Sequence, residues 1–194
     1  MLLKNLHDKR IILASQSPRR QELVRGLEIE PVMIVREVDE SYPESVRGVE
    51  VAAYVSKKKA EAYWNELEDN DVLITGDTVV VLGDRILEKP RNAEEARGML
   101  RDLSGKTHTV ASGIAVSTLK TGIQVRLDTC QVTFSELSDE FIAHYVDVYS
   151  PLDKAGAYGV QDLMGFVGVE RMEGSYFTVM GLPTRILYEL LSSV

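Results

Sequence analysis

The residues best suited to chemistry begin with an anion-binding pattern near the N-terminus. Residues 13–20 read LASQSPRR, in which small hydroxyl side chains precede a proline and two arginines. Ser17 is predicted to cap a helix through its hydroxyl, and Pro18 suits the first helical position. Helix N-termini attract anions, and guanidinium groups bind phosphate oxygens through paired donors. The pattern predicts a polyphosphate site, with plain surface charge as the alternative interpretation of the arginines.

Two carboxylates are candidates for catalysis or metal binding. Asp77 interrupts a run of β-branched residues, TGDTVVV at 75–81, where a charge is costly unless it is paired or works at a site. Such a residue can hold a divalent cation or accept a proton from an attacking water. Asp39 and Glu40 follow an expected strand, and they either solvate a loop or supply a second carboxylate near a metal.

Three lysines and an amide complete the set of candidates. Lys89 precedes a proline, which favours an extended backbone that can aim its ammonium group into a pocket. Lys59, beside Ala60, is the member of a three-lysine run that we expect to face inward. In the glycine-containing segment 150–161, Lys154 could contact phosphate and Gln161 could read a base edge. A plain glycine-rich turn is the alternative for that segment.

The elements that must position these residues alternate between strands and helices, which predicts an α/β fold. Asp77 falls on a buried strand, and Lys59 falls on the longest helix. Strands are expected at residues 10–15, 30–36, 72–82, 85–87, 107–118, 124–134, 165–171 and 176–179, and helices at 18–26, 49–67, 92–103, 138–148 and 183–191.

Composition limits the class of protein. With 194 residues, of which 44% are hydrophobic, the chain is expected to form one domain over 1–194. The net charge of −8 argues against nucleic acid or a membrane surface as the main partner. A single cysteine, Cys130, excludes an internal disulfide and a cysteine-rich metal site. We recognise no signal peptide and no membrane-length apolar run, so a cytoplasmic location is expected.

Several motifs in order resemble the Maf family of nucleoside triphosphate pyrophosphatases over essentially the whole length. They are LASQSPRR, TGDTVV, EKP, LSGKTH, PLDKAGAYGVQ and GSYFTVMGLP. The Ser-Pro-Arg-Arg and Asp-Lys-Ala-Gly-Ala-Tyr-Gly segments are similar to the branch that acts on dTTP and UTP. The resemblance implies an inosine-triphosphatase-like α/β fold: an elongated, mixed, twisted central β-sheet with flanking helices, and two lobes around a cleft.

The resemblance also implies an activity and a site. The activity is hydrolysis of dTTP and UTP, with modified pyrimidine nucleotides as further candidate substrates, to the monophosphate and pyrophosphate, with Mg²⁺ or Mn²⁺ as cofactor. It implies that Asp77 and Asp39 are catalytic or metal-binding acids. It implies that the triphosphate is surrounded by Ser15, Arg19, Lys59, Lys89 and Lys154, of which Lys59 and Lys89 also take part in catalysis. Base selection is assigned by the resemblance to Arg20 and Gln161. Two departures from the family pattern are Asp39, where Glu is usual, and Asp162, where Gly is common.

Two other functions stay open at this stage. The first is a non-catalytic nucleotide-binding regulator of septum formation, and the second is a purine (inosine or xanthosine) triphosphatase. Asp77 favours an enzyme, because a protein that only binds a polyphosphate has little need for a carboxylate beside it. A nucleoside triphosphate is the expected partner, and a homodimer is left open by the resemblance.

Overall fold

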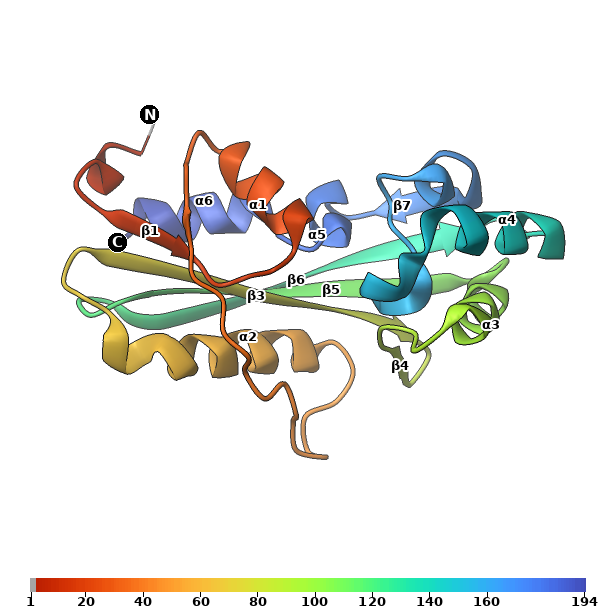
Figure 1. The fold of residues 1–194 in the computed structure, drawn as a ribbon, viewed down its shortest axis with the longest axis horizontal. Helices are drawn as coiled ribbons and strands as arrows, with labels where there is room; N and C mark the ends of the chain where they lie inside the picture. The colour runs from red at the N-terminus through yellow and green to blue at the C-terminus, as the bar shows by residue number, and fades with distance from the viewer. Residues whose placement is uncertain (1–2) are drawn as a thin grey trace.

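A long, twisted, mixed sheet forms the middle of the molecule in the computed structural model, which describes residues 3–194 (Figure 1). Its strand order is β2-β1-β3-β5-β6-β7, and β4 pairs with the far end of β3. β1 runs parallel to β2 and β3, whereas the other pairs are antiparallel. The strands are β1 (Arg10–Leu13), β2 (Val32–Met33), β3 (Asp71–Leu82), β4 (Arg85–Leu87), β5 (Thr107–Thr118), β6 (Gly122–Phe134) and β7 (Val169–Glu173).

One edge of β3 is interrupted, and this gap decides where a site can form. β1 pairs with β3 only as far as Ile74, and β4 begins to pair with it at Val80. Between these points, residues 75–79 have no strand neighbour on that side within residues 3–194, while β5 pairs with them on the other side. Asp77 lies in the middle of this gap, so its surroundings are supplied by loops and helices.

Helices cover the two faces of the sheet differently. α2 (Glu50–Tyr63) lies along β3, β5 and β6 on one face. Its approach to the sheet is close, since a Cβ on Gly113 of β5 would lie 2.2 Å from the Ala52 carbonyl oxygen. The other helices are α1 (Pro18–Arg25), α5 (Tyr176–Met180) and α6 (Thr184–Ser192) on the opposite face, and α3 (Ala93–Leu103) and α4 (Asp139–Tyr149), which pack together beyond the far end of β3.

Two large apolar clusters lie on either side of the gap. One gathers around Leu13 and Ile74 with α6, and the other around Leu100, Phe134 and Tyr145 with α3 and α4. Each fully buried large apolar side chain contributes about 1.5–3 kcal/mol relative to exposure. The two clusters support the two halves of the molecule, and polar residues line the cavity between them.

The sequence predicted the α/β class and most elements correctly. The Ser17 cap is confirmed, because its side chain accepts the Arg20 N–H, with Pro18 in the first turn. The strand expected at 30–36 is confirmed only at Val32–Met33. The Ile34 N–H still bonds to the Leu13 carbonyl of β1, but the Ile34 carbonyl and the Arg36 N–H both bond to the Tyr63 hydroxyl, so the strand ends there. No helix within residues 3–194 has the length and apolar character needed to cross a bilayer.

The predicted closing strands also need correction. Residues 176–179 form the short helix α5, which closes when the Gly181 N–H, in a left-handed conformation, bonds to the Phe177 and Thr178 carbonyls. Residues 165–171 begin as a wide helical turn over Met164–Gly168, and the strand is Val169–Glu173. Both segments are rich in aromatic and β-branched residues, so local composition favoured strands. In the first segment the turn at Gly181 closes a helix instead, and in the second the turn Met164–Gly168 delays the start of the strand.

Candidate active site

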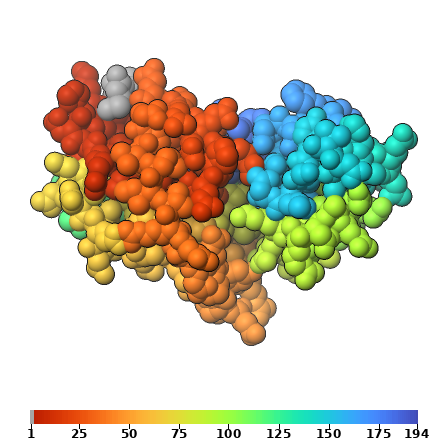
Figure 2. All heavy atoms as spheres, in the orientation of Figure 1, coloured from red at the N-terminus to blue at the C-terminus, as the bar shows by residue number. Residues whose placement is uncertain are grey.

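A cavity of about 660 Å³ opens at the gap in the edge of β3. Figure 2 shows the surface hollowed between the red and orange N-terminal residues and the cyan and blue residues of the other half. All of the predicted site residues except Asp39 line this cavity: Ser15, Arg19, Arg20, Lys59, Asp77, Lys89, Lys154 and Gln161. The structure therefore brings together side chains from five separate segments of the chain.

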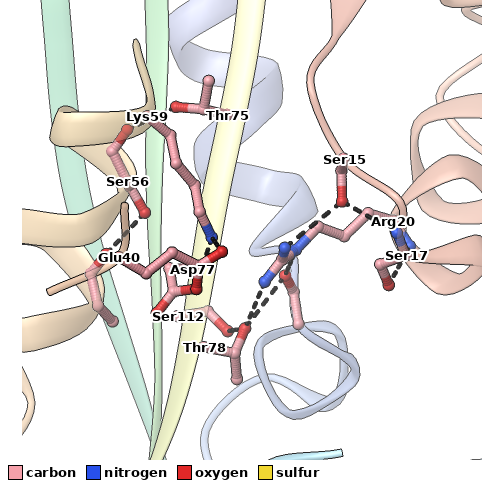
Figure 3. Close-up of polar contacts among 12 residues, drawn as sticks. Ser15, Ser17, Arg20, Glu40, Ser56, Lys59, Thr75, Asp77, Thr78 and Ser112 are labelled. Atoms are coloured by element: carbon pink, nitrogen blue, oxygen red, sulfur yellow. Dashed lines mark hydrogen bonds and ion pairs between the residues drawn. The ribbon is translucent and has the colours of Figure 1, made fainter. Parts of the chain in front are cut away.

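Asp77 forms a compact charged group with Lys59 and Glu40. The Lys59 ammonium donates to Asp77 Oδ1 at 2.9 Å and lies 3.0 Å from Glu40 Oε1. The side chains of Lys59 and Asp77 are only 13% and 16% exposed, so their attraction is less screened by water than that of a surface pair. A single ammonium group thus holds two carboxylates at the entrance to the gap (Figure 3).

The close docking of α2 places Lys59. The Thr75 hydroxyl, on β3, donates to the Ser56 carbonyl at 2.7 Å, one turn before Lys59. The Gly113 position admits the α2 backbone because it has no Cβ. Successive strand residues point to opposite faces, so Asp77 projects toward α2 while Thr78 projects toward α1 and α5 (Figure 3).

Asp39 is used by the loop that carries Glu40. Its carboxylate accepts from Lys58 Nζ at 2.8 Å and from the Ser41 N–H and hydroxyl at 2.9 and 2.7 Å. These hydrogen bonds, with that of Lys58 the largest contribution, hold the pKa of Asp39 far below its ordinary range. Asp39 does not line the cavity, and Glu40 does. The Asp-x-Ser spacing is a local turn pattern, and it is the signal that could have separated the two acids.

The N-terminus of α1 faces the cavity. Ser15 Oγ accepts the Ser17 N–H at 3.2 Å, and Gln16, Ser17 and Pro18 line the wall beside it. This arrangement gathers backbone N–H groups and hydroxyls at the positive end of a helix, where an anion is favoured.

Arg19 and Lys154 meet over one carboxylate. Asp153 accepts from Arg19 Nη1 at 3.1 Å and from Lys154 Nζ at 2.7 Å. Burial raises the pKa of Asp153, but these two cations outweigh that effect and leave the pKa below its ordinary value. The pairing fixes both cations at the cavity wall.

Arg20 is the centre of a buried network on the face opposite Lys59 (Figure 3). Its guanidinium donates to the Gly181 carbonyl at 2.8 Å and to Thr78 Oγ1 at 3.1 Å, and more distantly to Ser15 Oγ at 3.5 Å. Thr78 Oγ1 in turn lies 2.9 Å from Ser112 Oγ. Burial lowers the pKa of Arg20, while the nearby Asp77 opposes that shift. Arginine stays protonated in proteins, so a positive charge is fixed beneath the cavity.

Lys89 lies at the junction with a second cavity. This smaller cavity, of about 390 Å³, shares Glu40, Asp77, Thr78 and Lys89 with the first. Lys89 is exposed, and it hydrogen-bonds to no protein group in residues 3–194. A flexible ammonium group at this point can reach a ligand in either cavity.

The far end of the cavity is less charged and contains Gln161. Val110, Tyr158 and Val179 line it, and the Gln161 Oε1 atom is buried without a hydrogen-bond partner in the described part of the chain. Tyr158 is held from behind by His108, whose Nε2 lies 2.7 Å from the phenol oxygen. Burial lowers the pKa of His108 to about 4. An unpaired buried acceptor beside an apolar wall is suited to a base with an N–H group.

The donor set of the charged group fits a hard divalent cation. No cluster of three or more metal-binding side chains exists within residues 3–194. Asp77 and Glu40 both pair with Lys59, so two carboxylates lie close together at the cavity. Mg²⁺ is commonly bound by one or two carboxylates together with substrate phosphates.

Comparisons with known proteins show the family of the chain. The model of the family described as Maf-like protein matches residues 10–194. The dTTP/UTP pyrophosphatase of Phocaeicola vulgatus is 45% identical, with all of both chains covered. Those of Parabacteroides distasonis and Flavobacterium johnsoniae are 43% and 42% identical, covering 98% and 100% of both chains. A solved Staphylococcus aureus Ham1 protein matches 68% of this chain and 73% of its own, with 16% identity and a TM-score of 0.46.

Proposed function

The chain belongs to the Maf family, and we propose that it hydrolyses dTTP and UTP to the nucleoside monophosphate and pyrophosphate. Full-length relatives that carry the name dTTP/UTP pyrophosphatase support the substrate class. The observation that carries the proposal is Asp77, a shielded carboxylate held by Lys59 in a cavity lined by further cations. A protein that only binds polyphosphate gains nothing from such a carboxylate, which repels the ligand.

The proposed reaction is attack of water on the α-phosphorus. The water oxygen forms the new bond, and the bond from that phosphorus to the oxygen bridging to the β-phosphate breaks. Pyrophosphate leaves with the electron pair, and the proton of the water passes to Asp77 and then to solvent. Asp77 orients the water, while Lys59 keeps the carboxylate aimed and adds positive charge beside the reacting phosphate.

A divalent cation, Mg²⁺ or Mn²⁺, would be held by Asp77 and Glu40 with phosphate oxygens. When bound, the cation would neutralise the negative charge that accumulates on the phosphate oxygens during the reaction. We assign the second carboxylate to Glu40 instead of Asp39, because Glu40 lines the cavity and contacts Lys59, whereas Asp39 is bound by Lys58 and Ser41.

The phosphate chain would lie beside the N-terminus of α1, among the cations that line the cavity. Ser15 and the backbone N–H groups that follow it can donate to one phosphate, and Arg19 and Lys154 can bind its neighbours. Asp153 holds these two cations at the cavity wall. Lys89 reaches the remaining phosphate from the junction of the cavities.

The base would occupy the end that contains Gln161. Uracil and thymine both present an N3–H donor, which the unpaired Gln161 Oε1 can accept, whereas cytosine has an acceptor at that position. Arg20 would contribute to selection by holding Thr78 and Gly181 at the cavity wall. This arrangement favours uracil and thymine over cytosine. Hypoxanthine, the base of the alternative substrate class, also presents an N–H donor at N1, so the names of the full-length relatives are what support pyrimidines over purines.

Pyrophosphate release from a panel of nucleoside triphosphates tests this proposal. With Mg²⁺ or Mn²⁺ present, we expect turnover of dTTP and UTP well above that of CTP and ITP. Faster turnover of ITP would replace the pyrimidine assignment with the purine one. Binding without turnover of any nucleotide would favour the regulatory function instead.

A further inference from the structure

The loop that carries Gln161 is tied down from behind by α4. Gln161 lies between Gly159 and Asp162, at the start of the wide helical turn Met164–Gly168. The helix beneath this loop presents Tyr145, which is fully buried. Its ring stacks on Tyr149 of the same helix, with the ring centroids 5.1 Å apart. The phenol hydroxyl of Tyr145 therefore has a fixed place under the loop.

This one hydroxyl contacts the loop on both sides of Gln161. Tyr145 Oη accepts the Gly159 N–H at 3.1 Å and donates to Asp162 Oδ1 at 2.8 Å. Asp162 Oδ1 also accepts the Met164 N–H at 3.4 Å, which joins the carboxylate to the following turn. The Gly159 N–H and the Asp162 carboxylate, on either side of Gln161 in the sequence, thus hydrogen-bond to the same Tyr145 oxygen.

The space around the amide is correspondingly tight. A Cβ added to Gly159 would lie 2.6 Å from Asp162 Oδ2 and 3.0 Å from Gln161 Nε2. The Gln161 amide and the Asp162 carboxylate are therefore both packed against the Gly159 backbone, and Gln161 Oε1 is buried without a hydrogen-bond partner in the described residues, on a residue that lines the cavity. Discrimination by a polar group depends on its being held where the wrong base leaves it unsatisfied.

We propose that Tyr145 and Asp162 are positioning residues for base selection, and that their hydrogen bond fixes the Gln161 amide against the base. Neither residue lines the cavity, so both act through Gln161. This role rests on the proposed pyrimidine specificity. Because Asp162 departs from the family pattern, this contact is a feature of this chain.

Tyr145→Phe is the direct test, because it keeps the ring and removes only the hydroxyl. We expect KM for UTP to rise, and the ratio of kcat/KM for UTP to that for CTP to fall by about tenfold, as for the loss of one buried hydrogen bond. The kcat at saturating UTP should change much less. Tyr149→Phe is the matched control, since the Tyr149 hydroxyl makes no hydrogen bond within residues 3–194.

Asp162 provides a second, independent pair of variants. Asp162→Asn retains an oxygen that accepts the Tyr145 hydroxyl and should keep most of the UTP preference, whereas Asp162→Gly should lose it to the same extent as Tyr145→Phe. If Tyr145→Phe does not fold, this pair carries the test.

The outcomes separate this inference from the proposed function. An unchanged UTP to CTP ratio in Tyr145→Phe and Asp162→Gly, with a selective wild type, overturns the positioning role and leaves the proposed function standing. An equal loss of activity toward every nucleotide also overturns it, because that result indicates a purely structural role. A wild-type protein without pyrimidine selectivity overturns both.

Discussion

The two ends of the large cavity are built on different principles. The charged end takes Glu40, Lys59 and Asp77 from a loop, a helix and a strand that are distant in the sequence, and holds them by charge. The recognition end takes Tyr158 and Gln161 from one short segment, beside Val110 and Val179, and holds that segment through His108 and the Tyr145 hydroxyl. Chemistry thus depends on the topology of the sheet, whereas selection depends on the local shape of one loop.

This difference suggests that the two ends can be damaged separately. Changes at the charged end should lower kcat for every nucleotide by a similar factor, because all of them share the triphosphate. Changes at the recognition end should alter the ranking of nucleotides and leave the chemical step largely intact.

Lys59→Met should have the largest effect on kcat of any change at the charged end that leaves both carboxylates in place. Removal of the ammonium group leaves Asp77 and Glu40 facing each other unneutralised, and we expect kcat to fall by about 10²–10³-fold for dTTP and UTP alike. Steady-state pyrophosphate release measures this. Lys57→Met is the matched control, since Lys57 pairs only with Glu61 at the surface. A comparable loss in the control would contradict the assignment.

Acid should destabilise the folded protein through His108, behind the recognition end. Burial lowers the pKa of His108 to about 4 from an ordinary value of 6.5, so the unfolded chain binds this proton more readily than the folded one. The contribution of neutral His108 to stability is complete above pH 6.5 and is lost as the pH falls from 6.5 toward 4, by up to about 3 kcal/mol.

Urea unfolding at pH 7 and at pH 4.5 measures this loss. His108→Gln should remove the corresponding part of the pH dependence, whereas His144→Gln, at an exposed position, should leave it in place. Titration of the His108 ring signals near pH 6.5 in the folded protein would rule out the prediction.

A smaller effect distinguishes the two neighbouring acids of the loop. Glu40→Gln should lower kcat by about 10–100-fold and raise the concentration of Mg²⁺ needed for half-maximal rate, because a carboxylate at the cavity is lost. Asp39→Asn should change either quantity by less than about threefold, since its amide oxygen can still accept from Ser41. The reverse order would restore Asp39 as the second carboxylate.

The sequence predicted the local patterns of the site better than its assembly. Ser17 and Pro18 open α1 as expected, because capping is decided by adjacent residues. The partnership of Lys59 with Asp77 depends on how α2 docks over Gly113, and no local pattern contains that information. For the same reason the choice between Asp39 and Glu40 needed the structure: adjacent side chains on a loop point in different directions.

Long-range contacts also explain the elements and residues that the sequence did not identify. Residues 176–179 have strand-like composition, yet the Gly181 turn and the packing beside α1 make them helical. Tyr145 is an ordinary apolar position in the pattern of α4, and its hydroxyl has a role only because residues 159–162 fold over it.

The central claim is that Asp77 performs chemistry, and Asp77→Asn tests it most directly. Two quantities should be measured on the same preparation: pyrophosphate release from dTTP, and the equilibrium dissociation constant of dTTP by calorimetry. We predict a loss of about 10²–10⁴-fold in kcat, with dTTP binding unchanged or tighter, because an acceptor of the water proton is lost and a repulsive charge is removed. Retention of wild-type turnover by Asp77→Asn would contradict the account.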